Sequence, residues 1–125
     1  MSINKVILIG NVGKDPDVKR FDRGGLVAQF SMATTKKGYK RDDGREIPDR
    51  TEWHNIVLQG KLAEVAEKYV HKGDRLYIEG ELRTRSWEDG GVKRYVTEIY
   101  GHMMEMLSAQ KSQAPAPEPE YTEDL

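Results

Sequence analysis

The sequence of 125 residues contains no cysteine. Disulfide bonds, thiol nucleophiles and thiolate metal sites are therefore excluded, and the redox compartment cannot be read directly. The chain also lacks any apolar run near the roughly 20 residues of a membrane-spanning helix, since its longest, Val6 to Ile9, is strand-sized. The N-terminus has neither the apolar stretch nor the cleavage site of a secretory signal. We therefore expect a cytoplasmic protein with no membrane partner.

A strong excess of charge of one sign is also missing. The net charge at pH 7 is −1, of which the segment from Lys111 onward contributes −3 and residues 1–110 contribute +2. Proteins that bind duplex DNA by charge alone have a much larger basic excess. Any nucleic-acid binding by this chain must depend on the local arrangement of its residues.

No constellation of catalytic or metal-binding residues is present in the sequence. The three histidines have no metal-binding spacing, and "GNVGKD" at residues 10–15 lacks the second half of a phosphate-binding loop. The carboxylates between residues 42 and 49 raise the possibility of a metal-dependent nuclease, but they alternate with bases as in a solvated hairpin. We predict a protein that is not an enzyme and that needs no cofactor and no metal.

The length of the chain fits one domain followed by a tail. The last segment, "SAQKSQAPAPEPEYTEDL", has almost no aliphatic residues and ends in an acidic cluster. Such a composition cannot bury enough apolar surface to fold. We predict a folded domain at residues 1–107 and a disordered, proline-rich acidic tail at residues 108–125.

The N-terminal half shows two strand patterns and then a polar stretch. Residues 5–12, "KVILIGNV", are apolar on both faces, which suits a strand that is covered on both sides. Residues 26–35, "LVAQFSMATT", place Phe30 and Met32 on one face of a half-buried strand. The polar stretch from Lys36 to Arg50 contains six bases and a central turn signal.

The next segment, "TEWHNIVLQGKLAEVAEKY", changes its period from two residues to that of a helix. Trp53 falls on the wetter face of the strand, opposite Ile56 and Leu58. Apolar residues then recur at helical spacing over residues 62–70, which predicts one amphipathic helix of about three turns. A large aromatic side chain is thus directed away from the predicted core.

Two more strands, at residues 75–87 and 92–106, are joined by "EDGG", which predicts a tight hairpin. The order β-β-β-α-β-β is typical of an OB-fold, a five-stranded Greek-key barrel whose exposed face and loops bind oligonucleotides or oligosaccharides. A sandwich of short strands is the alternative. The position of the single helix favours the barrel, so the predicted fold is all-β with one helix.

The fourth predicted strand places Leu82 inward and Arg83, Arg85 and Trp87 on one outward face. Sites for single-stranded nucleic acid combine flat aromatic platforms with Lys or Arg at the spacing of the phosphates. The basic stretch 36–50, which is net positive and contains Tyr39, would then be a finger that closes over the bound strand. The alternatives are that the tryptophans only cover the barrel or a subunit interface, and that the stretch is a solvated turn.

These residues as a set resemble the bacterial single-stranded DNA-binding protein family. The resemblance runs from about Ile3 to Leu107 and is carried by "NKVILIGNVGKDPDVK", "TEWHNIVLQGKLAEVAEKYVHKGDRLYIEGELRTRSW" and "RYVTEI". It implies an OB-fold that assembles as a homotetramer and binds single-stranded DNA during replication, recombination and repair. It also implies a nucleoid-associated location, base stacking by Trp53 and Trp87, and a place for Tyr39 near a third stacking position.

The chain departs from the family pattern at three places. Asn55 and Gln59 stand where the family often has an arginine and a phenylalanine, so we expect a lower affinity per subunit. The chain ends in Glu-Asp-Leu instead of Ile-Pro-Phe. The expected partner-binding tip, for replication and repair proteins, is then a reduced one formed by Glu123, Asp124 and Leu125.

The primary hypothesis is sequence-independent binding and protection of single-stranded DNA. The alternative is an OB-fold interaction subunit of a replication-restart or recombination complex, whose main partner is a protein. The predicted DNA-binding residues are Trp53, Trp87, Tyr39, Arg83, Arg85, Lys36, Lys37, Lys61 and Lys72.

Overall fold

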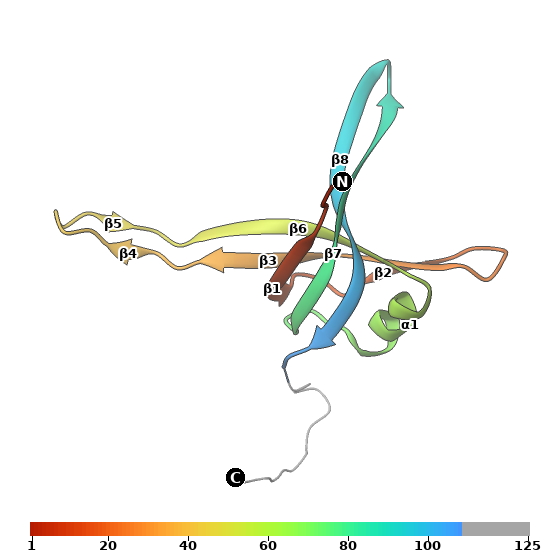
Figure 1. Cartoon of the computed structure of the whole chain (residues 1–125), viewed down its shortest axis with the longest axis horizontal. Helices are drawn as coiled ribbons and strands as arrows, with labels where there is room; N and C mark the ends of the chain where they lie inside the picture. Colours follow the sequence, from red (N-terminus) through yellow and green to blue (C-terminus); the bar gives the residue numbers. More distant parts are fainter. Residues whose placement is uncertain (109–125) are drawn as a thin grey trace, which may run out of the picture.

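The computed structural model describes residues 1–108, which form eight strands and one helix (Figure 1). The predicted tail tip, Glu123, Asp124 and Leu125, lies outside the described residues. The elements in chain order are β1 (Val6–Val12), β2 (Asp17–Arg20), β3 (Leu26–Lys36), β4 (Tyr39–Lys40), β5 (Glu46–Ile47), β6 (Arg50–Gln59), α1 (Gly60–Tyr69), β7 (Arg75–Asp89) and β8 (Val92–Met106).

Five of the strands close into a barrel. The sheet has the order β1-β7-β8-β6-β3-β2, and β1 also pairs with β3, so that the ring returns to its first strand. β6 and β8 pair in parallel, whereas the other pairs in the ring are antiparallel. The helix α1 lies between the third and fourth strands of this ring. The predicted all-β fold with one helix and a five-stranded barrel is confirmed.

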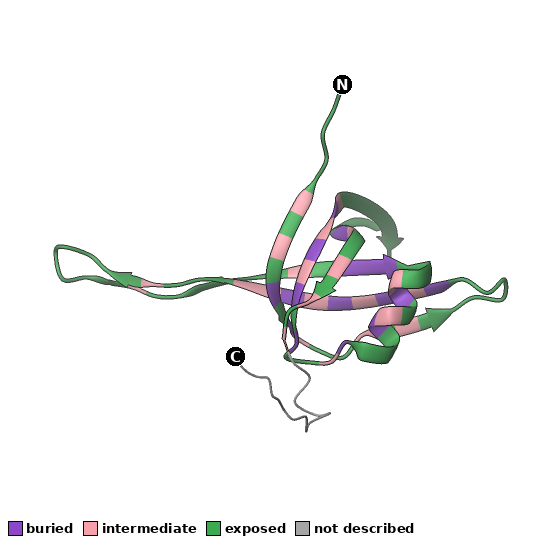
Figure 2. Ribbon diagram, turned by 60° about the horizontal axis from the view of Figure 1, so that its bottom comes forward, coloured by how far each residue is buried: buried purple, intermediate pink, exposed green. Residues whose placement is uncertain are grey.

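The core fills the barrel and continues under α1 (Figure 2). Alternate residues of β3 and β6 point inward, which accounts for the complete burial of Met32, Ile56 and Leu58. Ala63 and Ala66 form the buried side of α1, and their small side chains allow the helix to lie close to β3 and β6. The helical stripe and the inward rows expected from the sequence therefore meet in one core.

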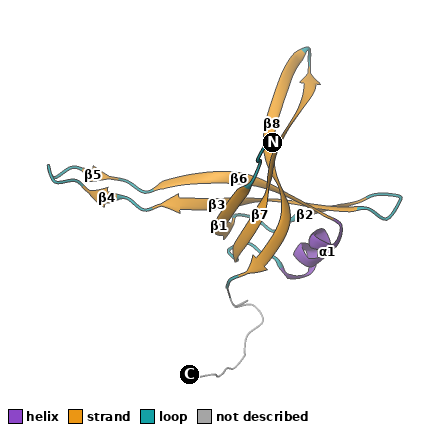
Figure 3. Ribbon diagram, viewed as in Figure 1, coloured by secondary structure: helices purple, strands orange, loops and turns teal. Residues whose placement is uncertain are grey.

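The β7–β8 hairpin extends well beyond the barrel (Figure 3). Gly90 and Gly91 form its turn with φ values of 58° and 86°, as a two-residue turn with positive φ at both positions requires. The sequence predicts that Leu82 points inward, and its side chain is expected to be buried. The predicted burial is wrong. Leu82 pairs with the core residue Ile99 but is 47% exposed, because β7 leaves the barrel at this point.

Two features were not foreseen in the sequence. The short strand β2 pairs with β3 at the edge of the sheet. It was missed because four residues of mixed polarity show too little alternation to indicate a strand. The polar stretch between β3 and β6 contains a ladder of its own, β4 with β5. Gly38 allows the chain to pass there, because a Cβ on it would lie 2.1 Å from the carbonyl oxygen of Ile47. We call residues 37–49 the finger.

Leu58→Ala should lower the free energy of unfolding by about 2–5 kcal/mol, because it leaves a cavity in a fully packed core. The matched control is Leu107→Ala, whose side chain is half-exposed at the end of β8 and whose loss should cost about 0.5 kcal/mol or less. Chemical denaturation followed by circular dichroism measures both. Equal losses in the two variants would contradict the assignment of the core.

Candidate nucleic-acid interface

One continuous surface is made by the side chains of β3, β6, β8 and β7 that alternate away from the core. Paired residues of a ladder point to the same side of a sheet. The ladders place Ala33 opposite Trp53, and Val57 opposite Tyr100, and β7–β8 continues the surface to Trp87. We call this surface the outer face. Its members are Gln29, Ser31, Ala33, Trp53, Asn55, Val57, Glu81, Arg83, Arg85, Trp87, Arg94, Val96, Glu98 and Tyr100.

Trp53 lies on β6 with 60% of its surface exposed, which confirms its predicted place on the wetter face of the strand. Its indole covers Gly13, because a Cβ at Gly13 would lie 2.5 Å from the Cζ3 atom of Trp53. One side of the ring thus rests on the backbone that follows β1. The rest of the ring is open to a stacking partner.

Trp87 is 42% exposed on the part of β7 that extends beyond the barrel. The guanidinium of Arg85 lies over its indole, 5.4 Å from the ring centroid. Arg85 also donates hydrogen bonds from Nε and Nη2 to Oε1 and Oε2 of Glu98, at 3.1 Å and 3.4 Å. The hydrogen bonds to Glu98, together with its negative charge, raise the pKa of Arg85, so the arginine is charged and is paired with Glu98 in this structure.

Arg83 repeats this arrangement one step closer to the barrel. Its Nε donates a hydrogen bond of 2.8 Å to Glu81, and its guanidinium lies 4.3 Å from the ring centroid of Tyr100. The hydrogen bond to Glu81 raises the pKa of Arg83 and lowers the pKa of Glu81. Both predicted arginines are therefore on the outer face, and each is neutralised by a neighbouring carboxylate.

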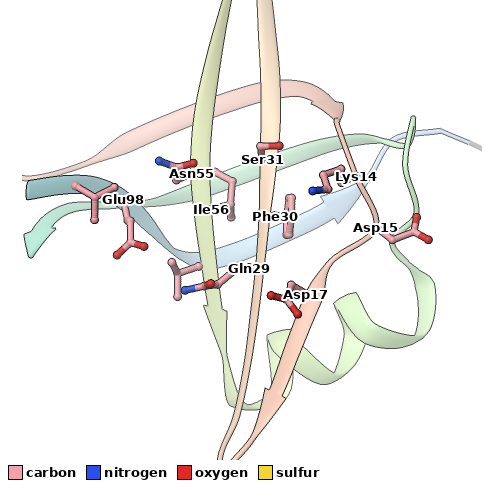
Figure 4. A pocket seen from close by; sticks show the side chains of 11 residues that line it. Lys14, Asp15, Asp17, Gln29, Phe30, Ser31, Asn55, Ile56 and Glu98 are labelled. Carbon is pink, nitrogen blue, oxygen red and sulfur yellow. The ribbon is translucent and has the colours of Figure 1, made fainter. Parts of the chain in front are cut away.

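A hollow of about 340 Å³ lies in the outer face, between β2, β3, β6 and β8 (Figure 4). Gln29, Ser31 and Asn55 contribute amide and hydroxyl groups to its wall, and Glu98 contributes its carboxylate. The position that the resemblance marks as a departure, Asn55, is thus a polar wall of this hollow. Gln59 is exposed at the end of β6 and does not line it.

Two of the predicted residues, Tyr39 and Lys37, lie in the finger, and a third, Lys36, lies at its base at the end of β3. Tyr39 is 60% exposed at the start of β4, and Lys37 is exposed beside it. Lys36 pairs with Arg50 at the end of the β3–β6 ladder. Since Lys36 alternates with Thr35 and Ala33, it falls in the row of Met32, opposite the row of Trp53. The finger is therefore adjacent to the outer face, but the side chain of Lys36 leaves the β3–β6 ladder on the opposite face of the sheet.

Neither Lys61 nor Lys72 belongs to a strand of the outer face, but the backbone of Lys72 contacts Asp15, which lines the hollow. Lys61 is in the first turn of α1, 3.9 Å from Glu64, and the backbone of Lys72 donates a hydrogen bond to Asp15 just after the helix. α1 lies at the opposite side of the molecule from the finger and from the tip of the β7–β8 hairpin (Figure 1). Both lysines stay predictions, and a contact with Lys61 would require a DNA strand that continues from the hollow toward α1.

Sequence reasoning missed Tyr100 and Glu98, which are central to the outer face. Both belong to one alternating row of β8, and that alternation was the available signal. Tyr95, which is exposed on the opposite side of the same hairpin with Lys93 over its ring at 6.0 Å, was also missed. These residues were missed because they stand among polar residues of β8, where the alternation of apolar and polar side chains is weak.

Within residues 1–108, no group of three or more histidine or acidic side chains is placed to hold a metal ion. No helix in the same part of the chain is long and apolar enough to cross a membrane.

Known proteins with a similar sequence bind single-stranded DNA according to their names. A model of the Single-strand binding protein family matches residues 3–107. The chain is 58% identical to a single-stranded DNA-binding protein of Bacteroides thetaiotaomicron, over 98% of this chain and 78% of that protein.

Two solved structures share the fold. The first is a complex of the Plasmodium falciparum SSB with single-stranded DNA, which has a TM-score of 0.76 and 35% identity over 86% of this chain and 97% of the other. The second is a deletion mutant of the single-stranded DNA-binding protein from Thermus aquaticus, with a TM-score of 0.72 and 25% identity over 86% of this chain and 52% of the other. From the extent of the family match and the identity to the Bacteroides protein, the chain belongs to the single-strand binding protein family.

Proposed function

We propose that this protein binds single-stranded DNA without sequence preference and protects it during replication, recombination and repair. The observation that carries the proposal is the exposure of two tryptophans on one continuous outer face. Every base has a π-face, so stacking on such rings tolerates any sequence. The proposal is further supported by the single-stranded DNA-binding relative and by the similar fold of a protein solved with single-stranded DNA.

The path of the bound strand follows from where the exposed rings lie. Trp53 is near the base of the finger, and Trp87 is on the β7–β8 hairpin. A strand that stacks on both crosses the outer face past the hollow at Asn55. The basic residues of the finger, which lies next to Trp53, would then contact the phosphates of the same DNA strand. The protein binds without catalysing a reaction, which is a prediction from the missing constellation of catalytic residues in the sequence.

We also propose that the protein is a homotetramer. Ile7 and Ile9 on β1, together with Met103 on β8, are each about half-exposed on the side of the barrel that faces away from the core. Exposed aliphatic side chains grouped on a sheet favour association. Recruitment of replication and repair proteins through Glu123, Asp124 and Leu125 stays a prediction. The alternative of an OB-fold interaction subunit would use the exposed tryptophans to contact a protein partner, and DNA would then bind weakly to the isolated chain.

Addition of oligo-dT at low salt should quench the tryptophan fluorescence, and added salt should reverse the quenching, because phosphate contacts release counterions. A fluorescence titration at two salt concentrations measures this. An absence of quenching at low salt would sink the proposed function.

Trp53→Ala should weaken binding of labelled oligo-dT by about 1–3 kcal/mol, which is the contribution of one stacked base. Fluorescence anisotropy measures the affinity, and thermal unfolding checks the fold. The matched control is Phe21→Ala, which removes an exposed ring from the turn between β2 and β3 and should leave the affinity unchanged. An unfolded Trp53 variant would show instead that Trp53 is structural, and an equal loss in the control would show that the effect is not specific to Trp53.

Ile9→Asp should break the assembly, because it places a charge in the exposed aliphatic group of β1 while leaving the core intact. Sedimentation velocity at micromolar concentration should give a tetramer for the unaltered protein and smaller species for this variant. Val92→Asp, at the exposed tip of the hairpin, is the control that should remain tetrameric. A monomeric unaltered protein would refute the proposal.

A further inference from the structure

The two arginines of the outer face are arranged in a way that does not suit simple phosphate binding. Each is paired with a carboxylate, Arg83 with Glu81 and Arg85 with Glu98. A surface that binds a polyanion through charge loses one positive charge with each such pair. The two carboxylates therefore do not strengthen binding through charge.

Glu98 is the more informative of the two carboxylates. Its side chain is only 7% exposed, whereas that of Arg85 is 56% exposed. A buried carboxylate needs a charged or hydrogen-bonding partner, and both of its oxygens receive one from Arg85. Glu98 thus fixes the guanidinium from below, and the upper surface of the arginine remains open to solvent.

The fixed guanidinium also lies over the indole of Trp87. A guanidinium is planar and weakly hydrated, and it stacks on aromatic faces in a way that a lysine ammonium does not. Glu98, Arg85 and Trp87 therefore form one stacked unit, in which the guanidinium lies over one face of the indole and presents its own outer plane to a base. Arg83 and Tyr100 provide a second such contact, 4.3 Å from guanidinium to ring.

We infer that Glu98 is a positioning residue of the DNA-binding face: it holds the Arg85 guanidinium over one face of Trp87, where the guanidinium is a flat stacking platform, and keeps it from acting as a phosphate ligand. This inference rests on the proposed binding of single-stranded DNA. It changes the role of Arg85, which the sequence pattern predicts to contact the phosphate chain.

The dependence of affinity on salt separates the two roles. Each cation that binds a phosphate of a single strand adds about 0.7 to the slope of log affinity against log salt concentration. An arginine that stays paired with Glu98 adds nothing to this slope. An arginine released from Glu98 becomes available to a phosphate.

The experiment measures that slope for a short labelled oligo-dT with four proteins. Relative to the unaltered protein, Glu98→Gln should steepen the slope by about 0.7 for each subunit that the oligonucleotide contacts. The double variant Arg85→Gln with Glu98→Gln removes the pair without changing the net charge, so its slope should equal that of the unaltered protein. Asp22→Asn, in the exposed turn after β2, is the control for net charge and should leave the slope unchanged.

A fifth protein tests the platform itself and does not disturb Glu98. Arg85→Lys keeps the charge but loses the planar group, so it should reduce the affinity about fivefold or more, the low end of a stacking contribution, with an unchanged slope. Circular dichroism establishes that each variant is folded. If Glu98→Gln does not fold, the lysine variant decides alone.

Three results would overturn the inference: an unchanged slope for folded Glu98→Gln, a slope shallower by about 0.7 for the double variant, or an unaltered affinity for Arg85→Lys. Each would make Arg85 an ordinary phosphate ligand or a residue without a role. If the unaltered protein does not bind oligo-dT at all, the proposed function fails. That outcome is distinct, because it is measured before any variant.

Discussion

The close approach of β1 to β3 is the contact on which the rest of the structure depends. A Cβ at Gly10 would lie 2.2 Å from the carbonyl oxygen of Ala33, so only glycine permits this approach. It lets Asn11 and Val12 pair with β3 while β1 also pairs with β7. The backbone amide of Gly13 then donates to the carbonyl of Ser31 at 2.9 Å. The barrel is closed by these few bonds.

Closure determines where the binding surface can be. Once the inward rows of the five strands are used for the core, the other rows of β3, β6, β7 and β8 join into one outer face. The same closure brings Gly13 under Trp53, which supports one side of the indole. The β7–β8 hairpin and the finger leave the barrel, so their side chains are free to meet a ligand. The potential binding surface therefore extends beyond the barrel along the hairpin and the finger.

Much of this fold could be predicted because its signals are local. Alternation along β6 placed Trp53 outward, the change of period located α1, and the paired glycines at 90 and 91 located the hairpin turn. The short strands β2, β4 and β5 were missed because two to four residues carry little alternation, whereas the error at Leu82 depends on partners distant in the chain. Leu82 has the pattern of a buried residue, but no strand covers it once β7 has left the barrel.

The sequence by itself therefore determined which side chains leave the core and which chemistry they offer, because both follow from residue type and from a period of two. Only the tertiary structure decided which of them meet. The ladder between β7 and β8 brings Arg85 within hydrogen-bond distance of Glu98. The packing of α1 places Lys61 outside the strands of the outer face. Strand register and barrel closure are non-local, so no short pattern records those neighbours.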